Sequence, residues 1–345
     1  MKRKIILYVI IGTLLISFNL QPEEIKETIL RPVFQFGGLN TEPQMQLNRP
    51  SDFLVTNNNE IIISDTDDHC VVLFNTDGTF IRRIGRKGQG PGEFIRPIKV
   101  SLWEDNLLVA DSGNYRIQIL TKSGECIKTY RFTESTLLGL DAHVFFTKQG
   151  DYYYGTNGLA SSHLIVHCSI KGEKLEGFGD IFGEKKFYVD MSTDLIKKGK
   201  IPNRYKNKVI PVVEPKSRSL YCVHCSIPVI KKFSSKGKLL WEKHLDFPEF
   251  AQIKSNWIKL NKEAPPKGSY NLEYWADADV NKEGDFFLLM RGSDQMTLLQ
   301  ISPQGIVSSV YRGVKDKISL INAINEDLWA FGGESHKFYK FILPF

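Results

Sequence analysis

The sequence predicts an all-β protein, a six-bladed β-propeller, on the basis of three observations. A unit of about 46 residues repeats along the chain, so that Asp65 matches Asp111 and Gly78 matches Gly124. Each unit contains four short apolar segments separated by Gly, Asn and Asp, which is typical of a four-stranded antiparallel blade. The last unit stops after its third strand, and a segment with the pattern of a fourth strand lies near the N-terminus.

The repeat divides the chain into six blades. In the first two, the second strands are "EIIISD" and "NLLVAD", each followed by turn residues. The weaker units keep an apolar third strand and a following glycine, at Gly172, Gly237 and Gly305. The expected blades span residues 50–86, 97–132, 139–179, 209–245, 272–312 and 318–343.

The missing fourth strand of the sixth blade is expected near the N-terminus. Residues 28–37, "TILRPVFQFG", have the pattern of a fourth strand followed by a connector. We expect them to pair with residues 337–343, because an open ring would leave sheet edges unpaired.

The N-terminus has the layout of a signal peptide. Lys2, Arg3 and Lys4 precede an uncharged apolar run of 14 residues, which is short for a membrane span. We expect residues 1–21 to be a signal peptide and the protein to be periplasmic or extracellular. No A-x-A precedes "QPEE", so an uncleaved membrane anchor remains an alternative.

The charge balance gives no sign of a nucleic-acid partner. The formal net charge of +6 falls to +3 when the three basic residues of the leader are removed (42 minus 39). The remaining charges are mixed along the chain, without the basic stripe expected of a nucleic-acid-binding protein.

Two insertions interrupt the repeat, at residues 180–208 and 246–271. Both separate a fourth strand from the next first strand, so both are expected on the same face of the ring. In the second insertion, Phe250, Ile253, Trp257 and Leu260 recur at spacings of three and four, which predicts an amphipathic helix. The insertions are expected either to pack on the rim or to form a lid over the ligand face.

The loop "GRKGQGPGEF" at residues 85–94 raises the question of a phosphate site. It lacks the Lys-Ser/Thr of a Walker A loop, and a strand rather than a helix follows it. Together with its continuation, "GQGPGEFIRPIKVSLWEDNLLVADSGNYRIQIL", the loop resembles the repeat of the NHL family of six-bladed propellers. The resemblance is strong over residues 84–120, fair over 50–84 and weak thereafter. It implies that the loop connects two blades, that Asp111 and Asn114 cap a turn, and that Arg116 packs along the blade surface.

Cysteines and histidines raise the question of a metal or redox site. Cys222 and Cys225 form a C-x-x-C in a second strand, where residues three apart point to opposite faces, so we expect buried structural cysteines. His69, His163 and His336 each begin a third strand, and Tyr115 is the equivalent in the second blade. Third strands of different blades are too far apart for a shared metal. The count of five is odd, and the disulfide pairing stays open for Cys70, Cys126, Cys168, Cys222 and Cys225.

The resemblance implies a binding module rather than an enzyme, and no catalytic residues or cofactor are predicted. NHL-type propellers present the face formed by the connectors between blades and by the turns between second and third strands. The ligand expected there is a protein, a peptide or a glycan. The candidate residues on this face are Asp67, His69, Arg86, Lys87, Arg96, Asn114, Tyr115, Trp257 and Arg291.

Two other functions stay open. One is a hydrolase or lyase that uses calcium or zinc at the central channel, for which the acidic residues near first strands are Asp52, Asp141, Asp277 and Asp279. The other is a structural scaffold in an envelope assembly.

Overall fold

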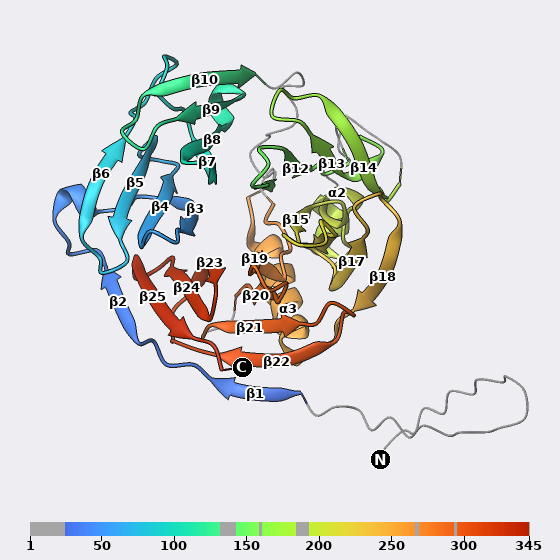
Figure 1. Cartoon of the computed structure of the whole chain (residues 1–345). Coiled ribbons are helices and arrows are strands. Elements are labelled where there is room, and N and C mark those ends of the chain that lie inside the picture. Colours follow the sequence, from blue (N-terminus) through green and yellow to red (C-terminus); the bar gives the residue numbers. More distant parts are fainter. Residues whose placement is uncertain are drawn as a thin grey trace, which may run out of the picture.

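Six antiparallel sheets surround a central axis in the computed structural model (Figure 1). The structure describes residues 25–131, 143–158, 161–183, 193–265, 269–292 and 295–344, with only the backbone at 193–194. The fold is therefore the six-bladed propeller that the repeat predicts. Strand order follows the sequence from the innermost strand to the outermost in blades 1 to 4, whereas an N-terminal strand is outermost in blades 5 and 6.

The first three blades contain four strands each. Blade 1 is formed by β3 (Pro50–Val55), β4 (Glu60–Asp65), β5 (Cys70–Asn75) and β6 (Phe80–Ile84). Blade 2 is formed by β7 (Pro97–Trp103), β8 (Asn106–Asp111), β9 (Arg116–Leu120) and β10 (Cys126–Arg131), with a short 3₁₀ turn at Ser112–Asn114. Blade 3 is formed by β11 (Val144–Phe146), β12 (Tyr152–Gly155), β13 (His163–Cys168) and β14 (Lys174–Asp180).

The last three blades complete the ring. Blade 4 is formed by β15 (Val209–Val213), β16 (Leu220–His224), β17 (Val229–Phe233) and β18 (Leu239–His244). Blade 5 contains β19 (Trp275–Val280), β20 (Phe286–Met290), β21 (Thr297–Ile301) and β22 (Val307–Arg312). Blade 6 contains β23 (Ile318–Ile324), β24 (Asp327–Gly332) and β25 (Lys337–Ile342).

The N-terminal segment closes the ring. Strand β2 (Phe34–Gly37) pairs antiparallel with β25, placing Phe34 opposite Lys340. The ring of Phe36 stacks on Phe338, with 5.1 Å between centroids, and also contacts Phe74 of blade 1 at 5.5 Å. The closing strand therefore joins the first and last blades through an aromatic cluster.

The sequence predicted one strand in this segment, and the structure contains two. Strand β1 (Lys26–Ile29) is the earlier one, and it pairs in parallel with β22 as a fifth strand of blade 5. Pro32 lies between β1 and β2 and has no N–H to continue a ladder. The segment thus spans the junction of blades 5 and 6 instead of adding to blade 6 alone.

The glycine-rich loop is a corner between blades 1 and 2. Gly85 has a φ of +86°, and a Cβ there would lie 2.4 Å from the ring of Phe94. Arg116 is buried and donates to the carbonyls of Gln89, Gly90 and Glu93 while pairing with Asp111. The expectation that Arg116 packs along the blade surface is therefore wrong, because its guanidinium holds the loop from inside.

The insertions contain the helices. Helices α1 (Thr193–Lys197) and α2 (Asn203–Lys206) lie in the first, and α3 (Pro248–Glu263) in the second. Part of the predicted apolar face of α3 packs on blade 5, where Phe250 contacts Trp275 at 5.4 Å between rings. The place predicted for Leu260 on that face is wrong, because Leu260 is 48% exposed. Both insertions follow a fourth strand and so lie on the face that carries the blade connectors. None of the helices in the described ranges is both long and apolar enough to cross a membrane.

Candidate functional site

Polar side chains on the innermost strands connect four successive blades around the axis. Asp279 of β19 accepts a hydrogen bond from the N–H of Ala323 in β23, at 2.8 Å. The amide oxygen of Asn322 accepts from Val55 of β3 at 2.9 Å. Asp52 of β3 accepts from Val100 of β7 at 3.0 Å. Innermost strands have an edge without a neighbouring strand, so these acceptors satisfy N–H groups that would otherwise lack partners.

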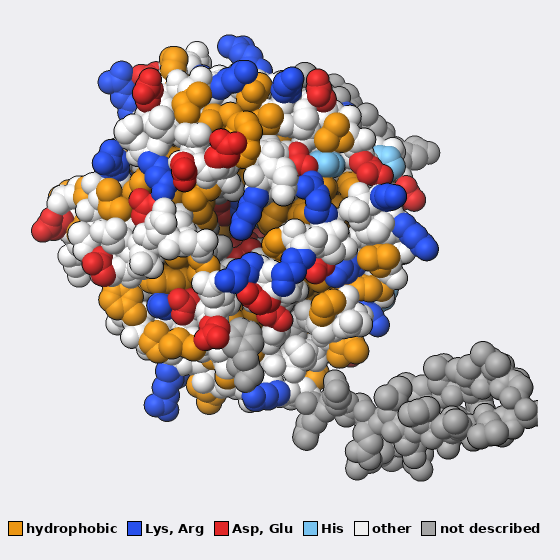
Figure 2. Space-filling view, in the orientation of Figure 1, with side chains coloured by type: hydrophobic (Ala, Val, Ile, Leu, Met, Phe, Trp, Pro, Cys, Tyr) orange, Lys and Arg blue, Asp and Glu red, His pale blue; other side chains and the backbone are white. Residues whose placement is uncertain are grey.

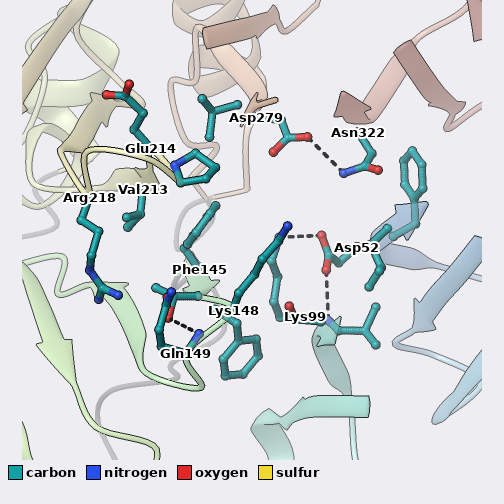
Figure 3. Close-up of a pocket in the computed structure, with 18 residues that line it drawn as sticks. Asp52, Lys99, Phe145, Lys148, Gln149, Val213, Glu214, Arg218, Asp279 and Asn322 are labelled. Carbon is teal, nitrogen blue, oxygen red and sulfur yellow. Dashed lines mark hydrogen bonds and ion pairs between the residues drawn. The ribbon is translucent and has the colours of Figure 1, made fainter. Parts of the chain in front are cut away.

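A cavity of about 220 Å³ opens at the axis beside these connections (Figure 3). Its wall is apolar, with Phe145 of β11 facing Val213 of β15 and Val280 of β19. Its polar side contains Lys99, Asp52, Asp279 and Asn322 from the innermost strands. An apolar pocket with a few convergent polar groups is the usual form of a small-ligand site.

The mouth of the cavity lies on the face opposite the insertions. It is formed by turns between first and second strands, at residues 147–149 and 214–218. Lys148 and Gln149 are exposed there, and Arg218 is partly exposed. Figure 2 shows this face, on which several Lys and Arg side chains, with Asp and Glu side chains nearby, lie beside the hollow at the centre of the ring.

One lysine lies among three carboxylates near the axis. Lys99 Nζ pairs with Asp52 Oδ1 at 2.6 Å. Burial raises the pKa of Asp52, while the charge of Lys99 acts in the opposite direction. Burial lowers the pKa of Lys99, but the carboxylates of Asp52 and Asp277 outweigh it and raise that pKa overall. The carboxylates therefore keep Lys99 protonated, whereas burial makes Asp52 easier to protonate than an exposed aspartate.

The other two carboxylates are less well neutralised. Burial raises the pKa of Asp277 to about 7 and the pKa of Asp279 to about 6. Asp277 accepts from the N–H of Ile321 at 2.9 Å, and Asp279 accepts from the Asn322 amide at 3.1 Å. Both partners are neutral, so the inner end of the cavity holds more negative than positive charge when these acids ionise.

A second charged network supports the rim. Arg218 Nη2 pairs with Asp151 Oδ2 at 2.7 Å, and the same oxygen lies 2.5 Å from His167 Nε2. Burial acts to raise the pKa of Asp151, but the hydrogen bond from His167 and the charge of Arg218 lower it overall. The imidazole of His167 stacks on Tyr153 at 4.1 Å. These contacts fix Arg218 at the mouth of the cavity.

Most residues that the sequence singled out lie on the opposite face, around blades 1 and 2. The N–H of Arg96 donates to His69 Nδ1 at 3.0 Å, and the Asn114 amide donates to Gly88 O at 2.9 Å. The Tyr115 side chain is 46% exposed. Asp67, Arg86 and Lys87 are also exposed in this region.

Two other candidates lie apart from that group. Trp257 is only 3% exposed and donates through its ring N–H to Tyr270 O at 2.7 Å. Its assignment to a binding surface is therefore wrong, because it belongs to the core between α3 and the ring. Arg291 is exposed on blade 5, where it pairs with Glu273 at 2.9 Å.

Two of the histidines singled out in the sequence contact connectors between blades, and the two cysteines of the C-x-x-C are buried. His336 Nδ1 lies 2.8 Å from Leu47 O, so His336 and His69 both contact connectors between blades. Within the described ranges, no three His, Cys, Asp or Glu side chains are placed to hold a metal ion. Asp141 lies outside those ranges. The burial predicted for Cys222 and Cys225 is confirmed, since both have 1% exposure or less and neither is in a disulfide.

The sequence analysis did not single out Lys99, Phe145, Lys148, Val213 or Arg218. A signal was present for part of this site, because charged residues interrupt the innermost strands "PSDFLV", "PIKVSLW" and "WADADV". A charged side chain in the middle of an innermost strand is costly to bury unless it is paired or hydrogen-bonded. The rim residues carry no such signal, since they lie in ordinary polar turns.

Comparison with protein families identifies a match for much of the chain. A family model described as "6-bladed beta-propeller" (DUF5128) matches residues 15–225. Among curated proteins, the human E3 ubiquitin-protein ligase TRIM32 is 39% identical over 66 residues, which are 19% of this chain and 10% of TRIM32. The Drosophila melanogaster protein brain tumor is 36% identical over 91 residues, 26% of this chain and 9% of that protein. The chain thus matches about a tenth of each relative.

Solved structures share the fold at low sequence identity. A member of the DUF4221 family from Bacteroides vulgatus aligns with a TM-score of 0.57 at 11% identity, covering 92% of this chain and 98% of that one. A protein from Bacteroides fragilis whose name describes it as exported aligns at 0.54 and 12%, covering 92% and 99%. A catalytically inactive variant of virginiamycin B lyase from Staphylococcus aureus, solved with quinupristin, aligns at 0.51 and 11%, covering 88% and 84%. At these identities the likeness concerns the fold alone.

Proposed function

Because the chain belongs to the family of 6-bladed beta-propellers matched by the DUF5128 model, we propose that it is a binding module whose ligand enters the axial cavity. The observation that carries this proposal is the cavity itself, which combines an apolar wall with charges of both signs. A peptide segment is the ligand class that suits this lining best, because peptides present apolar stems and charged groups together. The proposal places the ligand on the face opposite the one that the sequence analysis favoured.

The rigid surroundings of the cavity support a binding role. Its polar side is built on innermost strands that are hydrogen-bonded from blade to blade, and Arg218 is fixed by Asp151. A ligand would therefore meet groups that are already in place, which lowers the entropic cost of binding.

A cavity-filling variant tests the proposal. A random peptide library is screened on the purified protein without its leader, and each retained peptide is measured by titration against Val213→Trp. We expect binding to weaken by at least tenfold, because the indole would occupy the cavity. The matched control is Arg86→Ala with Lys87→Ala on the opposite face, which should leave affinity unchanged. Loss of binding in the control with full binding in Val213→Trp would move the site to the opposite face and refute the proposal.

We also propose that the protein is exported. The basic residues 2–4 and the apolar run at 5–18 support this, and one structural neighbour is described as exported. N-terminal sequencing of the protein purified from its host tests the idea. A mature chain that begins near residue 22 is expected, whereas an intact Met1 in the cytoplasmic fraction would refute export.

A further inference from the structure

The inner end of the axial cavity carries negative charge that the described residues leave without a matching cation. Lys99 lies 2.6 Å from Asp52 and so is already paired. Asp279 shares the same space, where its partners are the neutral N–H of Ala323 and the amide of Asn322. Asp277, two residues earlier in β19, also accepts from a neutral group, the N–H of Ile321. Buried carboxylates that lack a cation are costly when ionised.

The space beside these carboxylates is open rather than filled. The Asp279 carboxylate and Lys99 Nζ point toward the same part of the cavity (Figure 3). The Lys99 side chain keeps 29% exposure although it is surrounded by the ring, whereas that of Asp52 keeps 9%. A group entering along the axis would therefore come within reach of Asp279 without displacing the ion pair.

The lining differs from one side of the cavity to the other in a way that selects a ligand. Asp279 lies on one side, Phe145 and Val213 form an apolar wall, and Lys148 and Arg218 lie at the mouth. An anionic group would be repelled by Asp279, and an uncharged apolar group would leave Asp279 without a cation. A positive group on an apolar stem satisfies both sides.

We propose that the axial cavity selects a protonated amine carried on an apolar stem, such as a lysine side chain or the terminal amine of a peptide. This inference rests on the proposed function and names the chemistry that the same site recognises. The ammonium group pairs with Asp279, the stem packs between Phe145 and Val213, and an acidic or carboxylate group farther along the ligand meets Lys148.

Binding of the amine is coupled to loss of a proton. The charged groups around Asp279 in the cavity are Asp52 on β3 and Lys99 on β7, and the apolar β15 contributes none. Asp277 on β19 does not line the cavity but interacts electrostatically with Asp279 and Lys99. Burial raises the pKa of Asp279 to about 6, so this acid is partly protonated in mildly acidic solution. An ammonium group favours the carboxylate, so affinity should rise as the pH increases from 5 to 8.

Three probes of equal stem length test the selection directly. Pentylamine, pentanol and pentanoate are titrated by calorimetry into the protein without its leader at pH 7.5. We expect saturable binding of pentylamine alone, at least tenfold tighter than of the other two. Equal binding of all three would overturn the inference while leaving the cavity as a binding site. If no probe binds and Val213→Trp also leaves peptide binding unchanged, the proposed function fails as well.

A matched pair of variants assigns the charge. Asp279→Asn keeps an acceptor for Ala323 but removes the carboxylate, and it should weaken pentylamine binding at least tenfold. Asp77→Asn removes the same charge from an exposed turn on the same face and should have no effect. Unchanged binding in Asp279→Asn would overturn the inference. If that variant does not fold, the wild-type protein is titrated with pentylamine at pH 6, near the pKa of Asp279, in buffers of different ionisation enthalpy. Proton release must accompany binding there, and its absence would overturn the inference.

Two further measurements distinguish a lysine side chain from the terminal amine of a peptide as the group that binds. Retained peptides are compared after acetylation of the terminal amine and after replacement of each lysine by norleucine. Loss of binding from one change identifies the group that enters the cavity and supports the inference, whereas loss from neither contradicts it. A melting temperature raised by calcium but not by pentylamine would also contradict it, since the inner end would then be a metal site.

Discussion

Replacing Phe36 with alanine is expected to destabilise the ring because this side chain connects the closing strand to both the first and the last blade. Its ring stacks on Phe338 at 5.1 Å and contacts Phe74 at 5.5 Å. Truncating a fully buried phenylalanine costs about 3–5 kcal/mol, and Phe36 is only half-buried. We therefore expect a loss of about 2–3 kcal/mol in the free energy of unfolding.

Thermal unfolding monitored by circular dichroism measures this loss. For a domain of more than 300 residues, a loss of this size should lower Tm by about 3–5 °C. Ile29→Ala is the matched control, because it lies in the same N-terminal segment but is 76% exposed, and it should cost less than about 0.5 kcal/mol. If Phe36→Ala unfolds like the wild type, or if Ile29→Ala costs as much, β2 does not close the ring as described.

Three further predictions concern the axis and the corner loop. Lys99→Met should destabilise the fold by about 2 kcal/mol, because it leaves Asp52 unpaired. Adding Asp52→Asn should recover much of this loss. Denaturation midpoints of the single and double variants check both expectations. Burial raises the pKa of Asp277 to about 7, whereas an aspartate in the unfolded state has a pKa of about 4. Between these pH values the folded state holds a proton that the unfolded state has released. The free energy of unfolding should therefore fall between pH 4 and 7 because of this group. Asp277→Asn should flatten that fall in urea titrations, and an unchanged slope would exclude Asp277 as its source. Arg116→Ala should remove the hydrogen bonds to the carbonyls of residues 89, 90 and 93. Proteolysis within residues 86–93 should then be faster than in the wild type. Equal cleavage would show that the glycines alone keep the loop in its conformation.

The architecture could be predicted from the sequence because the blade is a local unit. Turn glycines and apolar strands recur at a fixed spacing, so that one well-formed repeat, residues 96–132, locates the others. The closing strand could also be predicted, since the sixth unit lacks a fourth strand. Strand β1 could not be predicted, because the four residues "KETI" carry little strand preference and their pairing with β22 depends on blades built much later in the chain.

The candidate site was only partly visible in the sequence. Asp52, Asp277 and Asp279 stood out as acidic residues near first strands, and the structure places them near the axis beside Lys99. The opposite wall, formed by Phe145 and Val213, looks like ordinary strand core. What makes it a wall is the arrangement of blades 3 and 4 around the cavity, which depends on contacts far apart in the chain.

A crystal structure of the protein with a peptide retained from the library tests the location of the binding site most directly. Electron density for the peptide is expected between Phe145 and Val213, with a positive group beside Asp279. Density on the opposite face, around Tyr115 and Arg96, with an empty axial cavity would contradict it.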